Sequence, residues 1–116
     1  MLLNNFFYLD DLQLSDTSVK AAIRIETAHP ILQGHFPQQP VVPGVCMMDM
    51  LQEILEQAFQ KKCQLQAASV VKFLNLFAPP AHVAAHWDIQ YMPAADQTYS
   101  VNATLQEGET VFMKFK

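Results

Sequence analysis

A proline-rich stretch that leads directly into an apolar segment constrains the fold of this chain more than any other feature. Pro37, Pro40 and Pro43 each fix the backbone φ angle and remove a hydrogen-bond donor, so this stretch is expected to be neither helix nor central strand. Gly44 follows, and from residue 45 to 51 every side chain except that of Asp49 is apolar. The order predicts a stiff, extended arm that joins a buried helix.

This helix is expected to run from about Val45 to Lys62. Its first part is apolar on all sides, which predicts burial on all sides, and an unpaired carboxylate there is costly. Asp49 is therefore the most informative residue of the chain. The free N–H groups at the helix start, beside Gly44, offer a site for a carbonyl oxygen or an anion. The second half of the helix carries apolar residues spaced for one face. Lys61 and Lys62 are expected in its last turn, where positive charges suit the negative C-terminal end of a helix.

Alternating apolar and polar residues predict several strands. The clearest covers residues 18–26, with Val19, Ala21, Ile23 and Ile25 on the buried face. Further strands are expected over 68–77, 83–91 and 99–105, and after a turn at Glu107-Gly108 over 111–115, whereas 6–14 is a weaker edge segment. A helix followed by antiparallel strands predicts an α+β fold, one domain over residues 1–116, with a curled sheet wrapped around one long central helix.

Composition narrows the class of protein. Hydrophobic residues make up 51% of the 116-residue chain and charged residues only 16%, which predicts that a partner subunit covers apolar surface, in a homodimer or a dimer-based higher oligomer. The net charge of −4, with seven Lys and Arg, argues against nucleic acid as a partner. Two cysteines are too few for a disulfide scaffold, and neither a signal sequence nor a membrane span is apparent, so a cytoplasmic location is expected.

The string GHFPQQPVVPGVCMMDM, residues 34–50, resembles the signature of the β-hydroxyacyl-acyl carrier protein dehydratases of fatty acid synthesis, which have the hot-dog fold. The shared features are a His-Phe motif, a Pro-x-x-Pro-Gly turn and a helix with one acid fourteen positions after the histidine, as Asp49 stands here relative to His35. The segment Val71-Lys72-Phe73 also resembles the start of the strand that follows the helix in that family, where a basic residue precedes Phe. The resemblance covers nearly the whole chain.

The resemblance implies that the protein dehydrates a 3-hydroxyacyl thioester, carried on acyl carrier protein, to the trans-2-enoyl thioester. It implies that His35 of one subunit and Asp49 of the other are the catalytic residues. The N–H of Gly44 would polarise the thioester carbonyl and the carbonyl of Val41 would hold the histidine tautomer. Neither a metal nor an organic cofactor is expected. The remaining residues assigned to substrate binding are Phe36, Val45 and Glu53.

The residue types suit this chemistry on physical grounds as well. Removal of a proton next to a thioester needs a base that titrates near neutral pH, which His35 supplies. The developing enolate needs fixed donors, and the helix start at Gly44 supplies them. The leaving hydroxyl needs a proton or a hydrogen bond from Asp49. Desolvation favours the protonated form of that carboxyl and the helix start opposes it, so its charge state is left open.

Two departures from the family pattern keep other functions open. Asp49 stands where the branch without isomerase activity usually has Glu, and Glu53 stands where Gln is common. A hot-dog thioesterase, which would use a helix carboxylate to activate water, is one alternative. A non-catalytic acyl-binding partner subunit is another.

Several residues also have simpler interpretations. Asp49 is alternatively a structural acid that caps loop N–H groups. A zinc site from His29, His35 and Cys46 lacks standard spacing. The Met47, Met48 and Met50 cluster is core or, as a second interpretation, lines an acyl tunnel. Three lysines are either a solvated face or a docking site for an acidic carrier protein: Lys61, Lys62 and Lys72.

Overall fold

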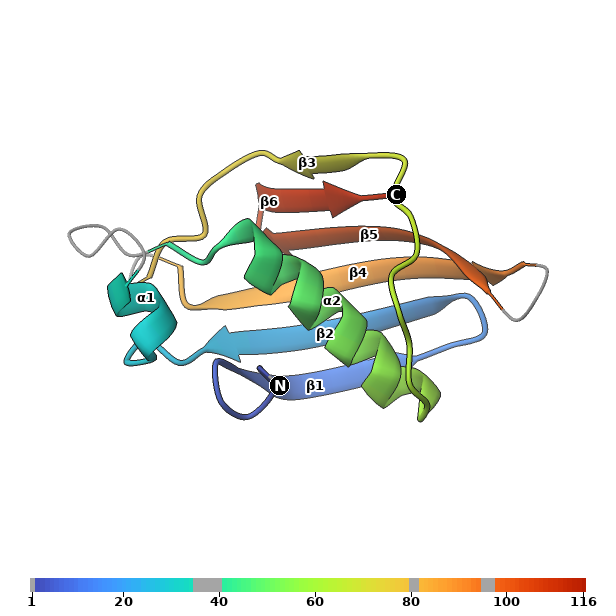
Figure 1. Ribbon diagram of the computed structural model, residues 1–116, viewed down its shortest axis with the longest axis horizontal. Coiled ribbons are helices and arrows are strands. Elements are labelled where there is room, and N and C mark those ends of the chain that lie inside the picture. Colours follow the sequence, from blue (N-terminus) through green and yellow to red (C-terminus); the bar gives the residue numbers. More distant parts are fainter. Residues whose placement is uncertain (1, 35–40, 80–81, 95–97) are drawn as a thin grey trace.

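The computed structural model of the protein describes residues 2–34, 41–79, 82–94 and 98–116. Within these ranges one antiparallel sheet of six strands has the order β1-β2-β4-β5-β6-β3, and helix α2 lies across one of its faces (Figure 1). The elements are β1 (Phe7–Leu14), β2 (Ser18–Ile25), α1 (Pro30–Gly34), α2 (Gly44–Phe59), β3 (Val71–Phe73), β4 (Ala84–Pro93), β5 (Tyr99–Glu107) and β6 (Thr110–Phe115). The expected α+β architecture is confirmed. No helix in the described ranges has the length and apolar character needed to cross a membrane.

The strands predicted from alternation are present in the middle of the sheet. In β2 the alternate residues Val19, Ala21, Ile23 and Ile25 are buried, and in β4 the buried residues are Ala85, Trp87 and Ile89. In β5, Ala103 and Leu105 complete the same face. Because side chains alternate between the faces of a strand, this one face forms the core and the other stays open to solvent.

Strand β6 departs from strict alternation. Phe112 and Met113 are adjacent in sequence and both fully buried, whereas Val111 is only half-buried. The pairing of β5 with β6 skips Phe112, since Leu105 lies opposite Met113 and Gln106 opposite Val111. An extra residue of this kind bends the strand and turns the next side chain. The bulge explains how two neighbouring residues reach the core.

Helix α2 is shorter than expected at its C-terminus. It ends at Phe59, and Gln60 adopts a left-handed conformation (φ 56°, ψ 41°) that stops the helix. Lys61 and Lys62 therefore follow the helix, so the expectation that they occupy its last turn is wrong. The Lys61 Nζ atom instead lies 5.1 Å from the centre of the Tyr99 ring.

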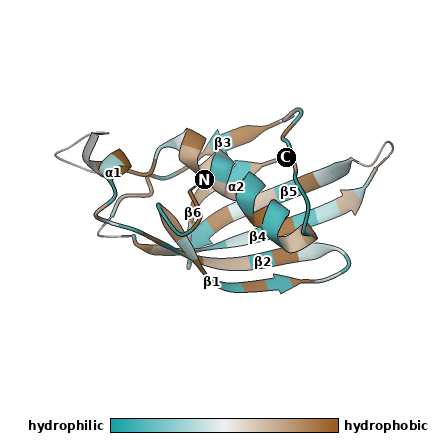
Figure 2. Cartoon of the chain, turned by 60° about the horizontal axis from the view of Figure 1, so that its bottom comes forward, coloured by the Kyte–Doolittle hydropathy of each residue, from teal (hydrophilic) through white to brown (hydrophobic). Residues whose placement is uncertain are grey.

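Burial of α2 on all sides is also wrong for the single chain. The sheet covers one side of the helix, where Met50, Leu51 and Ile54 are fully buried. On the opposite side Val45 is 72% exposed and Asp49 is exposed as well. Figure 2 shows hydrophilic and hydrophobic segments alternating along the helix. A single-layer sheet touches only one face of a helix, however apolar the remaining faces are.

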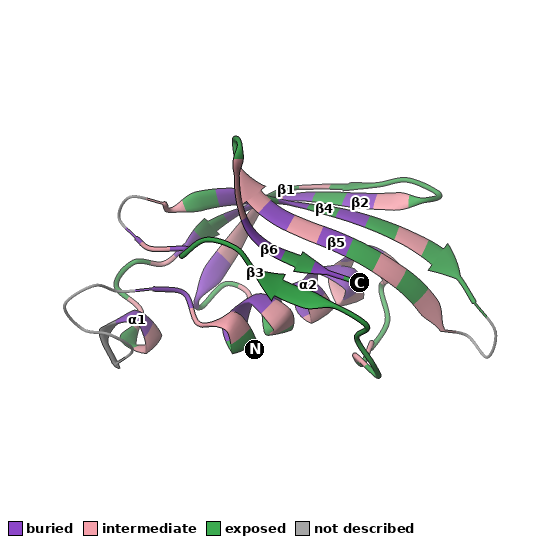
Figure 3. Ribbon diagram, turned by 90° about the horizontal axis from the view of Figure 1, so that it is seen from above, coloured by how far each residue is buried: buried purple, intermediate pink, exposed green. Residues whose placement is uncertain are grey.

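Strand β3 is the least covered element of the sheet. It comprises only three residues rather than the ten predicted, and each of them is exposed (Figure 3). Hydrogen bonds to β6 continue irregularly on both sides of it, from Ser69 N to the Lys116 carbonyl and from Leu74 N to the Phe112 carbonyl. The edge position leaves β3 a single neighbour, which accounts for its short length.

The short helix α1 was not predicted. Pro30 occupies its first position, where its missing N–H costs nothing, and the Nδ1 atom of His29 accepts a hydrogen bond from Ile31 N at 3.0 Å. The His29 ring also meets the Phe6 ring edge-on, with centroids 5.2 Å apart. His29 is thereby a structural residue that caps α1.

Candidate functional site

The candidate site begins at the N-terminus of α2. Pro43 is the N-cap residue, with φ −63° and ψ 148°, and no side chain caps the helix. The Pro43 carbonyl accepts the first hydrogen bonds, from Cys46 N at 3.0 Å and Met47 N at 3.2 Å. Among the described residues none accepts a hydrogen bond from the N–H of Gly44 or Val45. Two donors are therefore available at the positive end of the helix.

Gly44 is needed for close packing of an aromatic ring. A Cβ atom built on Gly44 would lie 2.8 Å from the Phe73 ring, closer than real contacts allow. Phe73 belongs to β3 and is 53% exposed, so its ring has room to shift. The glycine thus lets the helix start pack closely against the edge strand β3.

Asp49 lies one turn further along the exposed side of α2. Val45 and Asp49 are four residues apart and share this side, in line with the helix start. The carboxylate also acts on a neighbouring thiol, since burial raises the pKa of Cys46 and the negative charge of Asp49 raises it further. Gly44, Val45 and Asp49 are therefore arranged along one open face.

Glu53 lies on the buried flank of the same helix. It is 7% exposed, and its carboxylate accepts hydrogen bonds from Leu2 N at 3.0 Å and Leu3 N at 2.9 Å. These contacts give Glu53 a structural role, because they hold the N-terminal segment on α2 and satisfy a buried charge. Its assignment to the substrate site stays a prediction.

The remaining assigned residues divide between described and undescribed positions. Val41 is buried, and Val42 next to it donates its N–H to the Phe77 carbonyl at 2.7 Å, which fixes the backbone just before the helix. His35 and Phe36 lie outside the described residues. The structure therefore places Gly44, Val45 and Asp49 together and leaves the relation of His35 to them a prediction.

In the described ranges, no group of three His, Cys, Asp or Glu residues is close enough together to hold a metal ion. The zinc alternative includes His35 and so lies partly outside these ranges. Away from the helix start, His82 Nδ1 lies 2.9 Å from a Glu107 carboxylate oxygen, and His86 is exposed on β4. His82 and His86 are therefore ordinary partly buried and surface residues.

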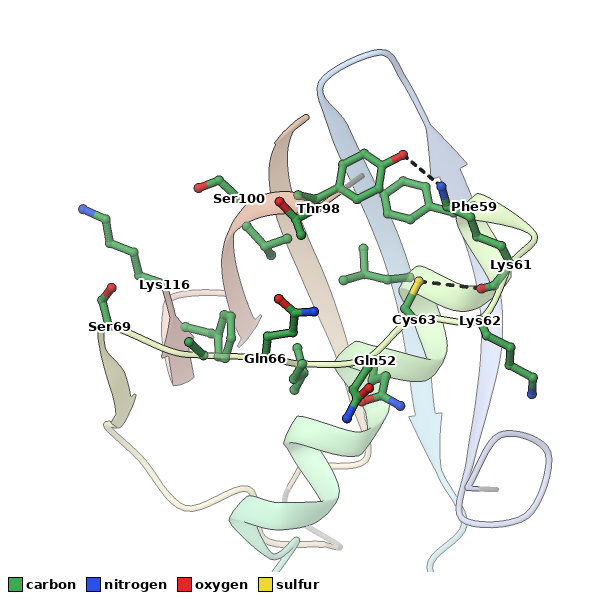
Figure 4. A pocket seen from close by; sticks show the side chains of 17 residues that line it. Gln52, Phe59, Lys61, Lys62, Cys63, Gln66, Ser69, Thr98, Ser100 and Lys116 are labelled. Atoms are coloured by element: carbon green, nitrogen blue, oxygen red, sulfur yellow. Dashed lines mark hydrogen bonds between the residues drawn. The ribbon is translucent and has the colours of Figure 1, made fainter. Parts of the chain in front are cut away.

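Sequence reasoning missed a second feature at the other end of α2. A cavity of about 500 Å³ lies beside Phe59, Tyr99 and the segment after the helix (Figure 4). Phe59 and Tyr99 stack with centroids 4.8 Å apart, and Tyr91 meets both rings edge-on. The sequence contains these aromatic residues, but no short-range pattern connects positions forty residues apart.

Comparison with known proteins identifies the family. A family model described as ApeI-like, ApeI dehydratase, matches residues 11–113, which is most of the chain. The chain therefore belongs to the ApeI-like dehydratase family. This agrees with the resemblance carried by residues 34–50.

Individual relatives support the same class. The chain is similar to the 3-hydroxyacyl-[acyl-carrier-protein] dehydratases FabZ of Streptococcus mutans, with 42% identity over 40 residues, and of Streptococcus pneumoniae, with 40% identity over 40 residues. Each match spans 34% of this chain and 29% of the relative. Among solved structures, the dehydratase heterocomplex ApeI:P from Xenorhabdus doucetiae is similar with a TM-score of 0.66 and 13% identity, covering 92% of this chain and 91% of that one. The expected hot-dog fold is confirmed.

Proposed function

We propose that this protein is a 3-hydroxyacyl-[acyl-carrier-protein] dehydratase, with His35 and Asp49 as its catalytic residues. The observation that supports the proposal most strongly is the open face of α2, where Asp49 lies one turn beyond two available N–H donors. The family membership and the FabZ relatives favour the same reaction class. Free cysteines at positions 46 and 63 agree with a reducing cytoplasmic location.

In the proposed reaction the thioester carbonyl accepts a hydrogen bond from Gly44 N–H at the helix start. His35 removes a proton from the carbon next to the carbonyl, and the negative charge that develops on the carbonyl oxygen is stabilised by the helix start. The hydroxyl at the next carbon takes a proton and leaves as water; the proton comes from Asp49 or, with Asp49 as a hydrogen-bond partner of the hydroxyl, from the protonated His35. The product is the trans-2-enoyl thioester.

Each active site is proposed to form between two copies of the chain. The exposed side of α2 and the edge strand β3 present apolar side chains that a single chain leaves uncovered, including Val45, Phe73, Leu74 and Leu76. Large exposed apolar residues in one region are typical of a protein interface. An interface at this face would cover Asp49 and bring His35 of the second copy next to it.

The acyl substrate is proposed to be carried by an acidic carrier protein. Lys72 of β3 lies directly opposite Lys114 of β6, and the described residues supply no ion-pair partner to either lysine. Like charges placed opposite one another disfavour the strand pair slightly and create a positive potential. An acidic partner that docks beside the site would neutralise this potential.

A coupled assay tests the reaction. The protein is incubated with a 3-hydroxyacyl thioester while enoyl absorbance and free thiol are followed together. Enoyl formation without thiol release is expected, and the His35→Ala and Asp49→Asn variants should each lose about 10²–10⁴-fold in rate. His86→Ala and Asp88→Asn, on the exposed face of β4, are matched controls that should keep full activity. Thiol release without enoyl formation would indicate a thioesterase. The absence of both signals would indicate a non-catalytic binding subunit.

Mixing the two inactive variants tests the shared site. In a dimer of one His35→Ala chain and one Asp49→Asn chain, one of the two sites keeps both catalytic groups. Random exchange should therefore restore about a quarter of the wild-type activity in a symmetric dimer. No recovery after verified subunit exchange would contradict a site built from two chains.

Glu53→Gln should retain activity if Glu53 acts only through the N-terminal segment.

A further inference from the structure

The cavity at the C-terminal end of α2 is separate from the candidate catalytic site. It lies between the helix, the segment 61–69 and the strands β5 and β6 (Figure 4), and Gly44, Val45 and Asp49 are not among its lining residues. Its volume of about 500 Å³ is within the range of small-molecule sites. The apolar part of its lining includes Leu55, Phe59, Leu65, Val101 and Phe115.

The wall of the cavity is built from packed aromatic rings. Phe59 at the end of α2 stacks on Tyr99 with an angle of 20° between the rings. Tyr91 supports both rings edge-on, at 5.0 Å from Phe59 and 5.9 Å from Tyr99, and its hydroxyl donates a hydrogen bond to the Ser15 carbonyl. Rings held from several sides keep their positions, so an apolar surface is ready for a ligand before it binds.

The side chains that line the cavity carry a charge opposite to that of the whole chain, and the nearby Glu56 carboxylate accepts a hydrogen bond from Cys63 N at 3.0 Å. The chain has eleven acidic and seven basic residues, yet the lining contains three lysines and no acid: Lys61, Lys62 and Lys116. Lys61 donates a hydrogen bond to the Tyr99 hydroxyl at 3.3 Å. Lys62 and Lys116 are exposed, without a side-chain partner among the described residues, and Figure 4 shows them extending outward from opposite parts of the rim.

We propose that this cavity binds a small amphipathic anion, with an apolar body against the aromatic wall and a carboxylate or phosphate at the lysine rim. The lining fits such a molecule better than the alternatives. A neutral apolar ligand would leave the lysines unused, and a fully polar anion would lie against apolar carbon. The amides of Gln52 and Gln66, which also line the cavity, add hydrogen-bond donors for the charged group. The proposal does not depend on the dehydratase reaction.

Calorimetric titration of the full chain tests the ligand class with three probes of equal chain length: octanoate, octyl phosphate and octanol. At low salt the two anions should bind saturably, one per chain. The better of them should bind at least about ten-fold more tightly than octanol, and its affinity should fall as salt is added. The ranking of octanoate and octyl phosphate identifies the charged group. Equal affinity for octanol, or no saturable binding below about 5 mM for either anion, would overturn the proposal.

Variants then locate the site. Lys62→Gln combined with Lys116→Gln should weaken anion binding about 3–10-fold and leave octanol binding unchanged. The matched control combines Lys20→Gln with Arg24→Gln, two exposed cations of β2 outside the cavity, and should bind as wild type. Val101→Trp should fill the cavity and abolish binding of all probes, with folding checked by circular dichroism. Loss of binding in the control, or unchanged anion affinity in the Lys62 and Lys116 variant, contradicts the proposed site.

Discussion

The two sides of helix α2 have different environments in the structure, although the first part of the helix is apolar in sequence except at Asp49. On the sheet side, Met50, Leu51 and Ile54 are fully buried within one chain. On the other side, Val45 is 72% exposed and Asp49 is open to solvent beside the helix start. The difference shows that the single chain uses one side of the helix for its own core and leaves the other side open to solvent.

The two edges of the sheet repeat this contrast. Strand β1 is longer, carries the acids Asp10 and Asp11, and has a bulge between Leu9 and Asp11; charges and bulges are usual protections of an edge against pairing with other chains. Its Asp10 forms an exposed ion pair with Arg24 at 3.2 Å. Strand β3 is short and presents Val71 and Phe73 to solvent. The β3 edge, next to the open side of α2, is the one suited to a partner.

The largest expected effect separates the two sides of α2. Leu51→Ala should lower the free energy of unfolding by about 2–5 kcal/mol, because it leaves a cavity in the core. Val45→Ala, on the open side, should change it by no more than about 0.5 kcal/mol. Urea denaturation followed by circular dichroism, at one protein concentration, gives both values. Similar losses for the two variants would show that the open side is also part of the core of a single folded unit.

Substitutions of Glu53 test the flank of α2 that lies between its covered side and its open side. Glu53→Leu removes the acceptor of the Leu2 and Leu3 N–H groups and should cost about 1–3 kcal/mol in unfolding free energy. Glu53→Gln keeps one acceptor oxygen and should cost less. The same denaturation experiment measures both variants, and greater protease sensitivity near the N-terminus should accompany the loss in Glu53→Leu. If the two variants are equally stable, these hydrogen bonds do not anchor the segment.

The open side of α2 beside the β3 edge is compared with the β1 edge by placing a charge on each. Val45→Asp, beside the β3 edge, should raise the dissociation constant of the proposed dimer at least about ten-fold, because a buried unpaired charge is unfavourable at an interface. Leu14→Asp, at the end of β1, replaces another exposed apolar residue and serves as the matched control. Sedimentation velocity over a concentration series gives both constants. Equal effects would remove the distinction between the edges.

The smallest effect concerns the thiol beside the open side. Because burial and the charge of Asp49 raise the pKa of Cys46, both folded and unfolded states hold the proton at neutral pH. As the pH rises through the thiol pKa of the unfolded chain toward the raised folded value, the unfolded state ionises first and stability is lost. In a Cys63→Ser background, Asp49→Asn should lower the pKa of Cys46, so alkylation at a given pH becomes faster and the alkaline loss of stability smaller. An alkylation profile that Asp49→Asn leaves unchanged would show that the charge of Asp49 does not affect the pKa of Cys46.

Local pattern predicted much of this fold. Alternation located the buried faces of β2, β4 and β5, because the period of a strand is visible within a few residues. Alternation also located β6, where Met113 and Phe115 are buried, but it did not predict the bulge that buries Phe112, since a skipped residue leaves no mark in the sequence. Local pattern also overextended β3 and α2, whose ends depend on a missing neighbour and on the left-handed Gln60.

The sequence by itself determined the residue types of the candidate site and their order, because a glycine at a helix start and one acid a turn and a half later follow from local spacing. The tertiary structure alone decided which side of α2 is covered and that a lysine-rimmed cavity forms at its far end. Those features arise from contacts between residues distant along the chain, such as Gly44 with Phe73 and Phe59 with Tyr99, and no local pattern encodes them.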